Sequence, residues 1–346
     1  MCSSILPGAM AELRWITTDA PGSERALFDT VIQRRIGRGA YTGLEFLHVE
    51  SRTIINRVPQ SPALPFEYTI NAYRGCSHAC TYCFARPTHD YLGLGIGRDF
   101  DTKIVVKINA PEVLRHETAP QRWAGHPIAM GTNTDPYQAA EGKYKLTRQI
   151  VEILAERGNP FSILTKSPLV LRDLDILTRA AKTTEISVNF SIGTLDTDAW
   201  SRSEPGTAHP RKRLDAVRRL NEAGISSGVL MMPILPGITD HPKQVEQLVK
   251  GATEAGARFI MGGYLHMREP LKDHVLEWID EDYPHLSRFY RHTYGTRSYA
   301  PPAMRRRLGG LIGRAKAAHG APGGKRRPPR DARRGKQPDP QLALFR

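Results

Sequence analysis

The chain has 346 residues, of which 40% are hydrophobic and 24% charged, and its formal net charge is +14. A chain of this length buries a substantial core without covalent staples, and four cysteines are too few for a disulfide scaffold. No apolar run approaches the roughly 20 residues of a membrane span, and no secretion signal is recognisable at the start. We therefore expect a cytoplasmic protein with no membrane partner.

The positive charge is concentrated near the C-terminus. Residues 305–346 hold 13 lysines and arginines but only two acidic residues, Asp331 and Asp339. The other 304 residues carry 36 basic and 33 acidic side chains. A nucleic-acid-binding role argued from charge is therefore supported for the C-terminal region and not for the rest of the chain.

Residues 1–65 contain short apolar pieces and several prolines, and they are predicted to form an irregular N-terminal extension. From residue 66 to about 300, strand-like runs alternate with amphipathic helical stretches. This alternation predicts βαβ units and a parallel sheet. Six such units favour an α/β fold built as a partial (β/α)6 TIM-type barrel. The predicted strands are 68–73, 128–132, 161–165, 186–192, 228–235 and 259–265, and the predicted helices are 145–157, 170–181, 210–223 and 242–255.

Two details of these helices can be checked in the structure. Gly224 and Gly256 follow the helices 210–223 and 242–255 and are predicted C-caps. The basic residues of the helix 210–223, Arg213 and Arg218 among them, are interpreted as a solvated surface.

Residues 301–346 form the third region. A C-terminal helix is predicted first, and beyond Arg314 the residues Gly, Pro, Ala, Lys and Arg dominate. Such a composition cannot bury enough apolar surface to offset the entropy of ordering the chain, and it predicts a disordered basic tail.

Three of the four cysteines, Cys76, Cys80 and Cys83, lie in one loop after the first predicted strand, with the spacing C-x3-C-x2-C. Short spacers of this kind let three thiolates meet at one metal centre. A structural zinc site needs four ligands, so His78 or His89 would have to complete it. A [4Fe–4S] cluster held by three cysteines instead leaves one iron open for a substrate or cofactor.

The pattern C-x3-C-x-aromatic-C, with Tyr82 as the aromatic residue, resembles the signature of the radical S-adenosylmethionine (SAM) superfamily. The sequence is similar to the branch that includes spore photoproduct lyase and DNA repair photolyase-like proteins. The stretches that carry this resemblance are 74–76, 83–86, 131–138, 165–167 and 204–207.

The resemblance implies a [4Fe–4S] cluster on Cys76, Cys80 and Cys83, whose open iron binds SAM. One electron, from a donor such as flavodoxin or ferredoxin, would cleave SAM. The resulting 5′-deoxyadenosyl radical would abstract a hydrogen atom from the substrate. The three cysteines are therefore also the candidate catalytic residues.

Residues after the next strands are candidates for contacts with SAM. The resemblance implies that the segment 131–135 meets the amino group, with Asp135 or Thr132 as acceptor, although an ordinary Asp-Pro turn is the alternative. Lys166 would meet the SAM carboxylate, a substrate phosphate or only solvent, and Ser191 the ribose or methionyl part. Tyr137, Tyr264 and Tyr290 have two interpretations, as relays for a radical and as packing residues, and tyrosines in a core of this size are usually the latter. The cofactor-binding candidates are thus Tyr82, Gly131, Thr132, Asn133, Asp135, Lys166 and Ser191.

The resemblance suggests DNA lesion repair or DNA modification, with a lyase reaction as one form. The lyase named above uses an additional cysteine as hydrogen donor, and the only other cysteine here is Cys2. We therefore do not expect this chain to carry out the lyase's reaction on a thymine dimer in the same way. The alternatives are a radical SAM enzyme that acts on RNA, a peptide or a small molecule, and a zinc-binding nucleic-acid module without catalysis.

The last six residues contain the apolar motif Gln341-Leu342-Ala-Leu344-Phe345. It resembles the motif that binds the bacterial sliding clamp, in which Gln and two apolar anchors occupy a pocket on the clamp. Here Leu344 and Phe345 would be the anchors, with Leu342 beside them. The alternatives are a chance match and a C-terminus that packs on its own barrel. If the motif binds the clamp, the basic residues of the region 305–346, with a net charge of +11, would contact the phosphates of the DNA that passes through the clamp.

Overall fold

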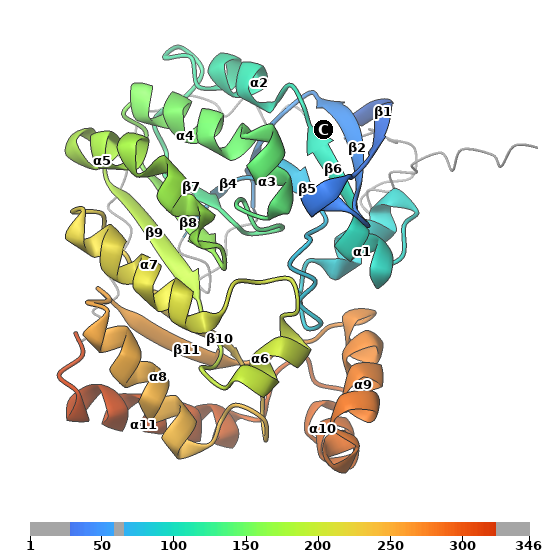
Figure 1. Cartoon of the computed structure of the whole chain (residues 1–346), viewed down its shortest axis with the longest axis vertical. Coiled ribbons are helices and arrows are strands. Elements are labelled where there is room, and N and C mark those ends of the chain that lie inside the picture. Colours follow the sequence, from blue (N-terminus) through green and yellow to red (C-terminus); the bar gives the residue numbers. More distant parts are fainter. Residues whose placement is uncertain (1–27, 59–65, 323–346) are drawn as a thin grey trace, which may run out of the picture.

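The computed structural model describes residues 28–58 and 66–322 of the chain, and the side chains from residue 31 onward in the first segment. Figure 1 shows two sheets, with helices outside the larger one and a helical pair at its end. None of the helices in these two segments is long and apolar enough to span a membrane.

The larger sheet has six parallel strands and one antiparallel strand at its edge. The parallel strands follow the chain order from β4 to β11, and β3 pairs antiparallel with β4. This arrangement confirms the predicted partial (β/α)6 barrel. The strands are β3 (Ile55–Arg57), β4 (Tyr68–Ile70), β7 (Ile128–Met130), β8 (Phe161–Thr165), β9 (Ile186–Ser191), β10 (Val229–Ile234) and β11 (Ile260–Tyr264).

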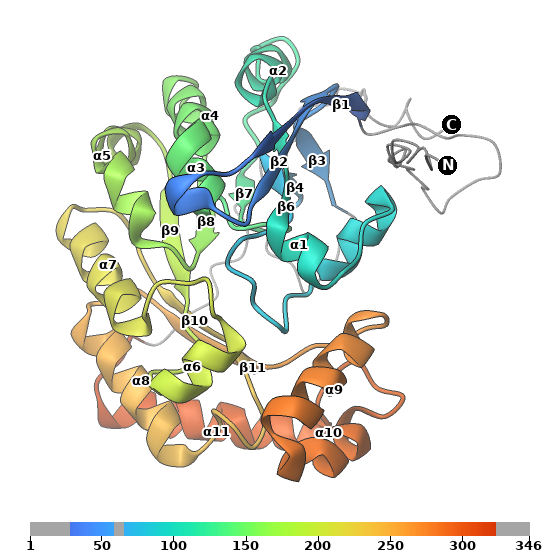
Figure 2. The same ribbon diagram turned by 45° about the vertical axis from the view of Figure 1, so that its right-hand side comes forward.

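Helices cover the outer face of this sheet, as Figure 2 shows for α4, α5, α7 and α8. Each buries an apolar face against the strands, and each predicted helix is present within a few residues of its predicted bounds. Gly224 and Gly256, predicted as C-caps, stand one position later, after the C-cap residues Ala223 of α7 and Ala255 of α8. Their φ angles of 80° and 71° are those of the left-handed residue that commonly follows a C-cap. The covering helices are α2 (Ala110–Glu117), α4 (Leu146–Glu156), α5 (Leu174–Thr183), α7 (Pro210–Glu222), α8 (Pro242–Glu254) and α11 (Pro302–Ala318).

A second sheet corrects the prediction for the N-terminal region. Within residues 28–57 the chain forms strands instead of an irregular extension, and two of them join a four-stranded sheet of order β1-β2-β6-β5. The buried residues Phe46 and Val49 of β2 pack on β6, which lies more than 50 residues away in the sequence. A local pattern does not reveal such a partner. The strands are β1 (Phe28–Ile36), β2 (Glu45–Ser51), β5 (Tyr73–Arg74) and β6 (Lys103–Lys107).

Short helices gather at the carboxyl ends of the parallel strands. In Figure 2, α9 (Leu271–Asp282) and α10 (Ser287–Tyr294) lie at this end, together with α6 (Thr197–Ser203). α9 and α10 take part in a second apolar core, which also contains Cys80 and Tyr82. The remaining short elements are η1 (Gly39–Tyr41), η2 (Arg86–Leu92), α1 (Arg98–Thr102), α3 (Ala139–Tyr144), η3 (Pro168–Asp173) and η4 (Pro284–Leu286).

The C-terminal helix is longer than expected. α11 continues to Ala318, beyond Arg314, where the change in composition predicts the start of the tail. Its buried residues Leu308, Ile312 and Ala315 are spaced three and four apart and pack on the main core. The motif Gln341–Phe345 lies outside the described residues.

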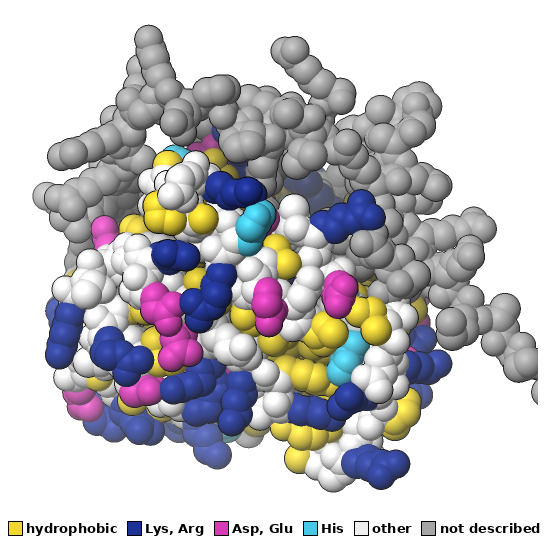
Figure 3. Space-filling view, turned by 90° about the horizontal axis from the view of Figure 1, so that it is seen from above, with side chains coloured by type: hydrophobic (Ala, Val, Ile, Leu, Met, Phe, Trp, Pro, Cys, Tyr) yellow, Lys and Arg dark blue, Asp and Glu magenta, His cyan; other side chains and the backbone are white. Residues whose placement is uncertain are grey.

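The surface charge of the described part is mixed. On the face drawn in Figure 3, lysine and arginine side chains alternate with acidic and neutral ones and do not form one continuous basic patch. This distribution agrees with the nearly balanced charge of residues 1–304.

Candidate cluster and cofactor site

The three cysteines lie on the loop that follows β5, and a glycine fixes the start of this loop. Gly75 has a φ of +77°, and a Cβ there would come within 2.8 Å of His89 and 2.9 Å of the Lys103 carbonyl oxygen. The Gly75 carbonyl oxygen accepts hydrogen bonds from Thr134 Oγ1 (2.6 Å) and Gln138 Nε2 (2.8 Å). The loop is therefore tied to the segment that follows β7.

The thiols of Cys76 and Cys80 are buried and that of Cys83 is partly exposed, and none forms a disulfide. Burial raises the pKa of all three thiols. Iron–sulfur ligation needs thiolates, so metal binding must offset this cost. The described segments contain no group of three or more Cys, His, Asp or Glu that would hold a single metal ion. The two histidines that would have to complete a zinc site are engaged elsewhere, because His78 lies 3.3 Å from Asp135 and His89 lies 3.0 Å from the Lys103 carbonyl oxygen. Three cysteines suit a four-iron cluster, in which each cysteine binds one iron.

A second loop, residues 203–207, braces the cysteine loop. Thr81 N donates to the Ser203 carbonyl oxygen (3.1 Å), and Gly206 N donates to the His78 carbonyl oxygen (3.0 Å). A Cβ at Gly206 would lie 2.2 Å from the Ser77 carbonyl oxygen, so a side chain there would push the cysteine loop away. The glycine of the stretch 204–207 thus permits close contact between the two loops.

A buried ion pair stabilises the loop 203–207 against the cysteine loop. Glu204 accepts a hydrogen bond from the Tyr82 hydroxyl and pairs with Arg213 Nη2 at 2.5 Å. Burial opposes ionisation of Glu204, but Arg213 and Lys166 outweigh it and lower the pKa of this carboxyl. Arg213 also donates to the Ser191 carbonyl oxygen (3.0 Å). Tyr82 of the cysteine motif is thereby joined to β9.

Arg213 was not expected in the site, and the prediction that it belongs to a solvated helix surface is wrong. Its side chain is completely buried, whereas Arg218 on the same helix is exposed and pairs with Asp215 and Glu222. Periodicity alone does not identify a buried arginine in a row of basic residues. Glu204, which belongs to the stretch 204–207 that carries the family resemblance, was the only feature of the sequence that could have indicated a buried partner for Arg213.

Gly131 lies directly after β7 and allows close packing of β7 on β8. Its φ is +89°, and a Cβ there would lie 2.0 Å from the Leu164 carbonyl oxygen. The next two residues contact Asn71, which follows β4: Asn71 Nδ2 donates to Thr132 Oγ1 (3.3 Å), and Asn133 N donates to Asn71 Oδ1 (3.1 Å). This segment thus stands at the carboxyl ends of two adjacent strands, where barrel sites are built.

Asp135 connects the cysteine loop with the end of β8. Its carboxylate accepts hydrogen bonds from Thr165 Oγ1 (2.7 Å) and Lys166 N (2.7 Å), and it lies 3.3 Å from His78 Nδ1. Burial would raise the pKa of this carboxyl, but His78 and the hydrogen bonds from Thr165 and Lys166 lower it to about 2. Since Tyr137 N also donates to it (2.9 Å), the geometry favours a linking role over contact with an ammonium group of SAM.

Lys166 and Ser191 come together from neighbouring strands. Lys166 Nζ is 3.0 Å from Ser191 Oγ, which donates in turn to the Met232 carbonyl oxygen (2.7 Å). The ammonium group also lies 5.7 Å from the centre of the Tyr82 ring. Burial would lower the pKa of Lys166, but Cys80 and Glu204 outweigh it and raise it. A positive charge is thus held beside the cysteine motif, as binding of a carboxylate requires.

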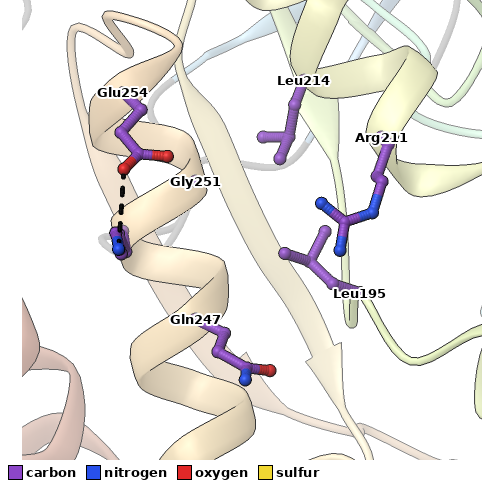
Figure 4. A pocket seen from close by; sticks show the side chains of 7 residues that line it. Leu195, Arg211, Leu214, Gln247, Gly251 and Glu254 are labelled. Carbon is purple, nitrogen blue, oxygen red and sulfur yellow. Dashed lines mark ion pairs between the residues drawn. The ribbon is translucent and has the colours of Figure 1, made fainter.

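The pocket in Figure 4 is separate from this site. It has a volume of about 410 Å³ and lies between α7 and α8. Leu195 and Leu214 form its apolar side, and Gln247 and Glu254 come from α8. None of the residues discussed above lines it, so it does not serve as the cofactor site.

Comparison with known proteins identifies the family. The family model described as the Radical SAM superfamily matches residues 70–249. An uncharacterised protein of Mycobacterium tuberculosis (strain H37Rv) is 42% identical over 275 residues, which cover 80% of this chain and 81% of that protein. A radical SAM Nα-GlyT isomerase of Pseudomonas phage M6 is 24% identical over 197 residues, 55% of this chain and 38% of that protein.

The fold is similar to that of spore photoproduct lyase. A single-residue mutant of that enzyme superposes with a TM-score of 0.60 and 19% identity, and the match covers 80% of each chain. The lyase has also been solved with bound AdoMet and a dinucleoside spore photoproduct, with a TM-score of 0.57 to this chain, 17% identity and 76% coverage of both chains.

Proposed function

The chain belongs to the radical SAM superfamily, and on this premise we propose that it is a radical SAM enzyme that repairs or modifies DNA. The arrangement of the cysteine loop supports the enzymatic part most directly. Tyr82 of this loop lies beside Lys166, which contacts Ser191 from the neighbouring strand. Both Lys166 and Ser191 stand at the carboxyl ends of parallel strands, where barrel enzymes build their active sites.

Members of this superfamily use a [4Fe–4S] cluster and SAM. Cys76, Cys80 and Cys83 would hold the cluster here. When bound, the two cofactors together supply a 5′-deoxyadenosyl radical, formed by one-electron reduction of SAM, which abstracts a hydrogen atom from a substrate. A reductant is therefore required, and we propose a flavodoxin or a ferredoxin as the electron donor.

The protein's own residues orient SAM. We assign its carboxylate to the Lys166 ammonium and the Ser191 hydroxyl, which are already 3.0 Å apart. We assign its amino group to the segment with Gly131, Thr132 and Asn133, which lies across from Lys166 at the ends of β4 and β7. Asp135 holds this segment, the cysteine loop and β8 together and so fixes the distance between cluster and SAM.

One comparison supports DNA as the substrate, because the lyase with the similar fold is described with a dinucleoside spore photoproduct. The basic C-terminal region adds salt-dependent affinity for phosphates. A lyase reaction on a DNA photoproduct is one form of the proposal, and the absence of a cysteine besides Cys2 outside the motif argues for a different hydrogen donor.

The C-terminal motif supports a site of action at replicated or repaired DNA. We propose that Gln341, Leu342, Leu344 and Phe345 bind the bacterial sliding clamp. DNA and the proposed electron donors, a flavodoxin or a ferredoxin, are found in the cytoplasm. We therefore propose that the protein acts there.

Formation of 5′-deoxyadenosine tests the substrate class. The anaerobically purified protein is mixed with SAM, a reductant and UV-irradiated DNA, unirradiated DNA, RNA or a peptide mixture. Stimulation by one of the DNA samples alone is expected. Stimulation by RNA or peptide but not by DNA would exclude the proposed substrate. One zinc per chain without iron would instead show a non-catalytic module.

A further inference from the structure

Gln138 contacts the cysteine loop on both sides of Cys76. Its side chain is fully buried, and the residue is the N-cap of α3. Nε2 of Gln138 donates a hydrogen bond to the Gly75 carbonyl oxygen (2.8 Å), and Oε1 accepts one from Ser77 N (3.0 Å). One amide group therefore holds the peptide before Cys76 and the peptide after it.

The two peptides need opposite groups, and the amide supplies both. A carbonyl oxygen only accepts and a peptide N–H only donates, so these partners fix Nε2 on the side of Gly75 and Oε1 on the side of Ser77. Nε2 also donates to Thr134 Oγ1 (2.8 Å). These hydrogen bonds offset the cost of burying the polar amide of Gln138.

Residues close to Gln138 in the sequence reinforce this contact. Thr134 Oγ1 donates to the same carbonyl oxygen as Gln138 Nε2 (2.6 Å), and Ala139 N donates to Ser77 Oγ (3.2 Å). The segment 131–135, to which we assign the amino group of SAM, ends three residues before Gln138. The contact therefore joins the cysteine loop to this segment.

The other two cysteines are held in a different way, by a residue of their own loop. Arg86 is buried, and its Nε donates to the Cys80 carbonyl oxygen (3.0 Å). Its backbone N donates to the Cys83 carbonyl oxygen (3.1 Å). Cys80 and Cys83 are thus held by Arg86, whereas the peptides on both sides of Cys76 are held by Gln138.

A four-iron cluster needs each of its three cysteines at a set position, and residues behind the ligands provide this order. We propose that Gln138 is the positioning residue for Cys76 and that its amide keeps this cysteine where it binds iron. This inference rests on the proposed attachment of the cluster to Cys76, Cys80 and Cys83. Gln138 acts through the two peptides beside Cys76 and is not itself a ligand.

Asn159 provides a matched control at the opposite end of the barrel, where it precedes β8. Its side chain is 2% exposed, and its amide also both accepts and donates. Trp123 Nε1 donates to Oδ1 (2.7 Å), and Nδ2 donates to the His126 carbonyl oxygen (3.1 Å). Gln138→Met and Asn159→Leu each remove one buried, hydrogen-bonded amide, so both should lower the urea midpoint of the full chain.

Hydrogen exchange in the cluster-free full chain, followed by mass spectrometry, is the first measurement. Gln138→Met leaves the Ser77 N–H without its acceptor, so exchange in peptides that cover residues 75–83 should become about tenfold faster. Asn159→Leu should leave these peptides as in the wild type and accelerate exchange in residues 119–128 instead. Unchanged exchange of residues 75–83 in Gln138→Met, or equal acceleration there in both variants, would overturn the inference.

The second measurement follows the cluster after anaerobic reconstitution. A chelator should remove half of the iron from Gln138→Met at a concentration roughly tenfold lower than from the wild type, as expected when a residue that orients a metal ligand is lost. The electron paramagnetic resonance spectrum of its reduced cluster should also differ. Asn159→Leu should match the wild type in both respects. Equal loss of iron in the two variants would show a general effect of destabilisation and contradict the positioning role.

Failure of the inference and failure of the proposed function give different results. Iron in the wild type, held equally well and with the same spectrum in Gln138→Met, would overturn the inference and leave the proposed cluster in place. A wild type that binds no iron after reconstitution would overturn both. If Gln138→Met does not fold, Gln138→Asn, whose amide is one methylene shorter, takes its place with the same expected results.

Discussion

Asp135 shows how much a single side chain contributes to the cofactor site. It receives hydrogen bonds from the residues at the end of β8 and stands 3.3 Å from His78 in the cysteine loop. The family resemblance suggested contact with the amino group of SAM, but spacing in a sequence does not show which acceptors are already occupied. The geometry shows that both carboxylate oxygens are engaged within the protein.

The pH dependence of stability tests this linking role. The pKa of Asp135 is lowered from 3.8 to about 2 in the folded chain, so its stabilisation is complete above pH 5 and is lost as the pH falls from about 4 to 2. Asp135→Asn in the cluster-free protein should therefore cost about 2 kcal/mol in the free energy of unfolding at pH 7, about half of that at pH 3 and little at pH 2. Urea unfolding at several pH values measures this. A cost that is independent of pH would show that the charge of Asp135 does not stabilise the fold.

Lys166 is the residue on which proposed SAM binding depends most. Its ammonium lies over the Tyr82 ring and donates a hydrogen bond to the Ser191 hydroxyl, so a SAM carboxylate would gain a charge-assisted hydrogen bond there. Lys166→Met should weaken SAM binding by roughly 10- to 100-fold, as loss of a hydrogen bond to a charged group does. Lys250→Met on the surface of α8 is the matched control. Anaerobic calorimetric titration with SAM measures both variants, and unchanged affinity in Lys166→Met would contradict the assignment.

The strands and helices of the barrel could be predicted from the sequence because each shows, along its own length, the spacing of apolar residues that is typical of a strand or a helix. Six apolar runs became the six parallel strands, and four amphipathic stretches became α4, α5, α7 and α8. The small sheet could not be predicted in this way, because Phe46 and Val49 are buried by a strand far away in the sequence. The same reason applies to the site: the loop 203–207 braces the cysteine loop through contacts over more than 100 residues.

The contact between α7 and the cysteine loop yields a prediction for a whole element. Arg213 is fully buried and paired with Glu204, so Arg213→Met leaves a buried carboxylate without its partner and should destabilise the fold by about 3–5 kcal/mol. Arg218→Met, five residues further along α7 and on its exposed side, should leave the free energy of unfolding nearly unchanged. Urea unfolding gives both values, and iron content after reconstitution shows whether the loop still holds the cluster.

A second substitution separates charge from packing in this pair. Adding Glu204→Met to Arg213→Met removes the unpaired carboxylate and should recover part of the lost stability. The iron content of the double variant should be lower than that of the wild type, because the Tyr82 hydroxyl has lost its acceptor, Glu204. No recovery in the double variant would show that the packing of α7, and not the buried charge, holds the brace.

At the scale of the whole molecule, charge divides the chain into two parts. The barrel and its flanking elements carry almost balanced charge, and the face in Figure 3 mixes both signs. The C-terminal region adds the excess of lysine and arginine and ends in the apolar motif. If the proposed action on DNA holds, the barrel determines the chemistry and the C-terminal region determines where on DNA the enzyme works.

Binding to a bacterial sliding clamp tests this division of roles. Leu344→Ala/Phe345→Ala removes the two proposed anchors, and loss of two buried apolar side chains should weaken binding to the clamp by at least about 100-fold. Substituting Lys336, Arg334 and Arg333 by Gln is the matched control. It should preserve clamp binding but reduce the salt dependence of DNA binding, because fewer counterions are released. If the intact protein does not bind the clamp, the C-terminal region acts only through its charge. RNA then has to be screened as thoroughly as DNA, because phosphate contacts alone do not distinguish the two.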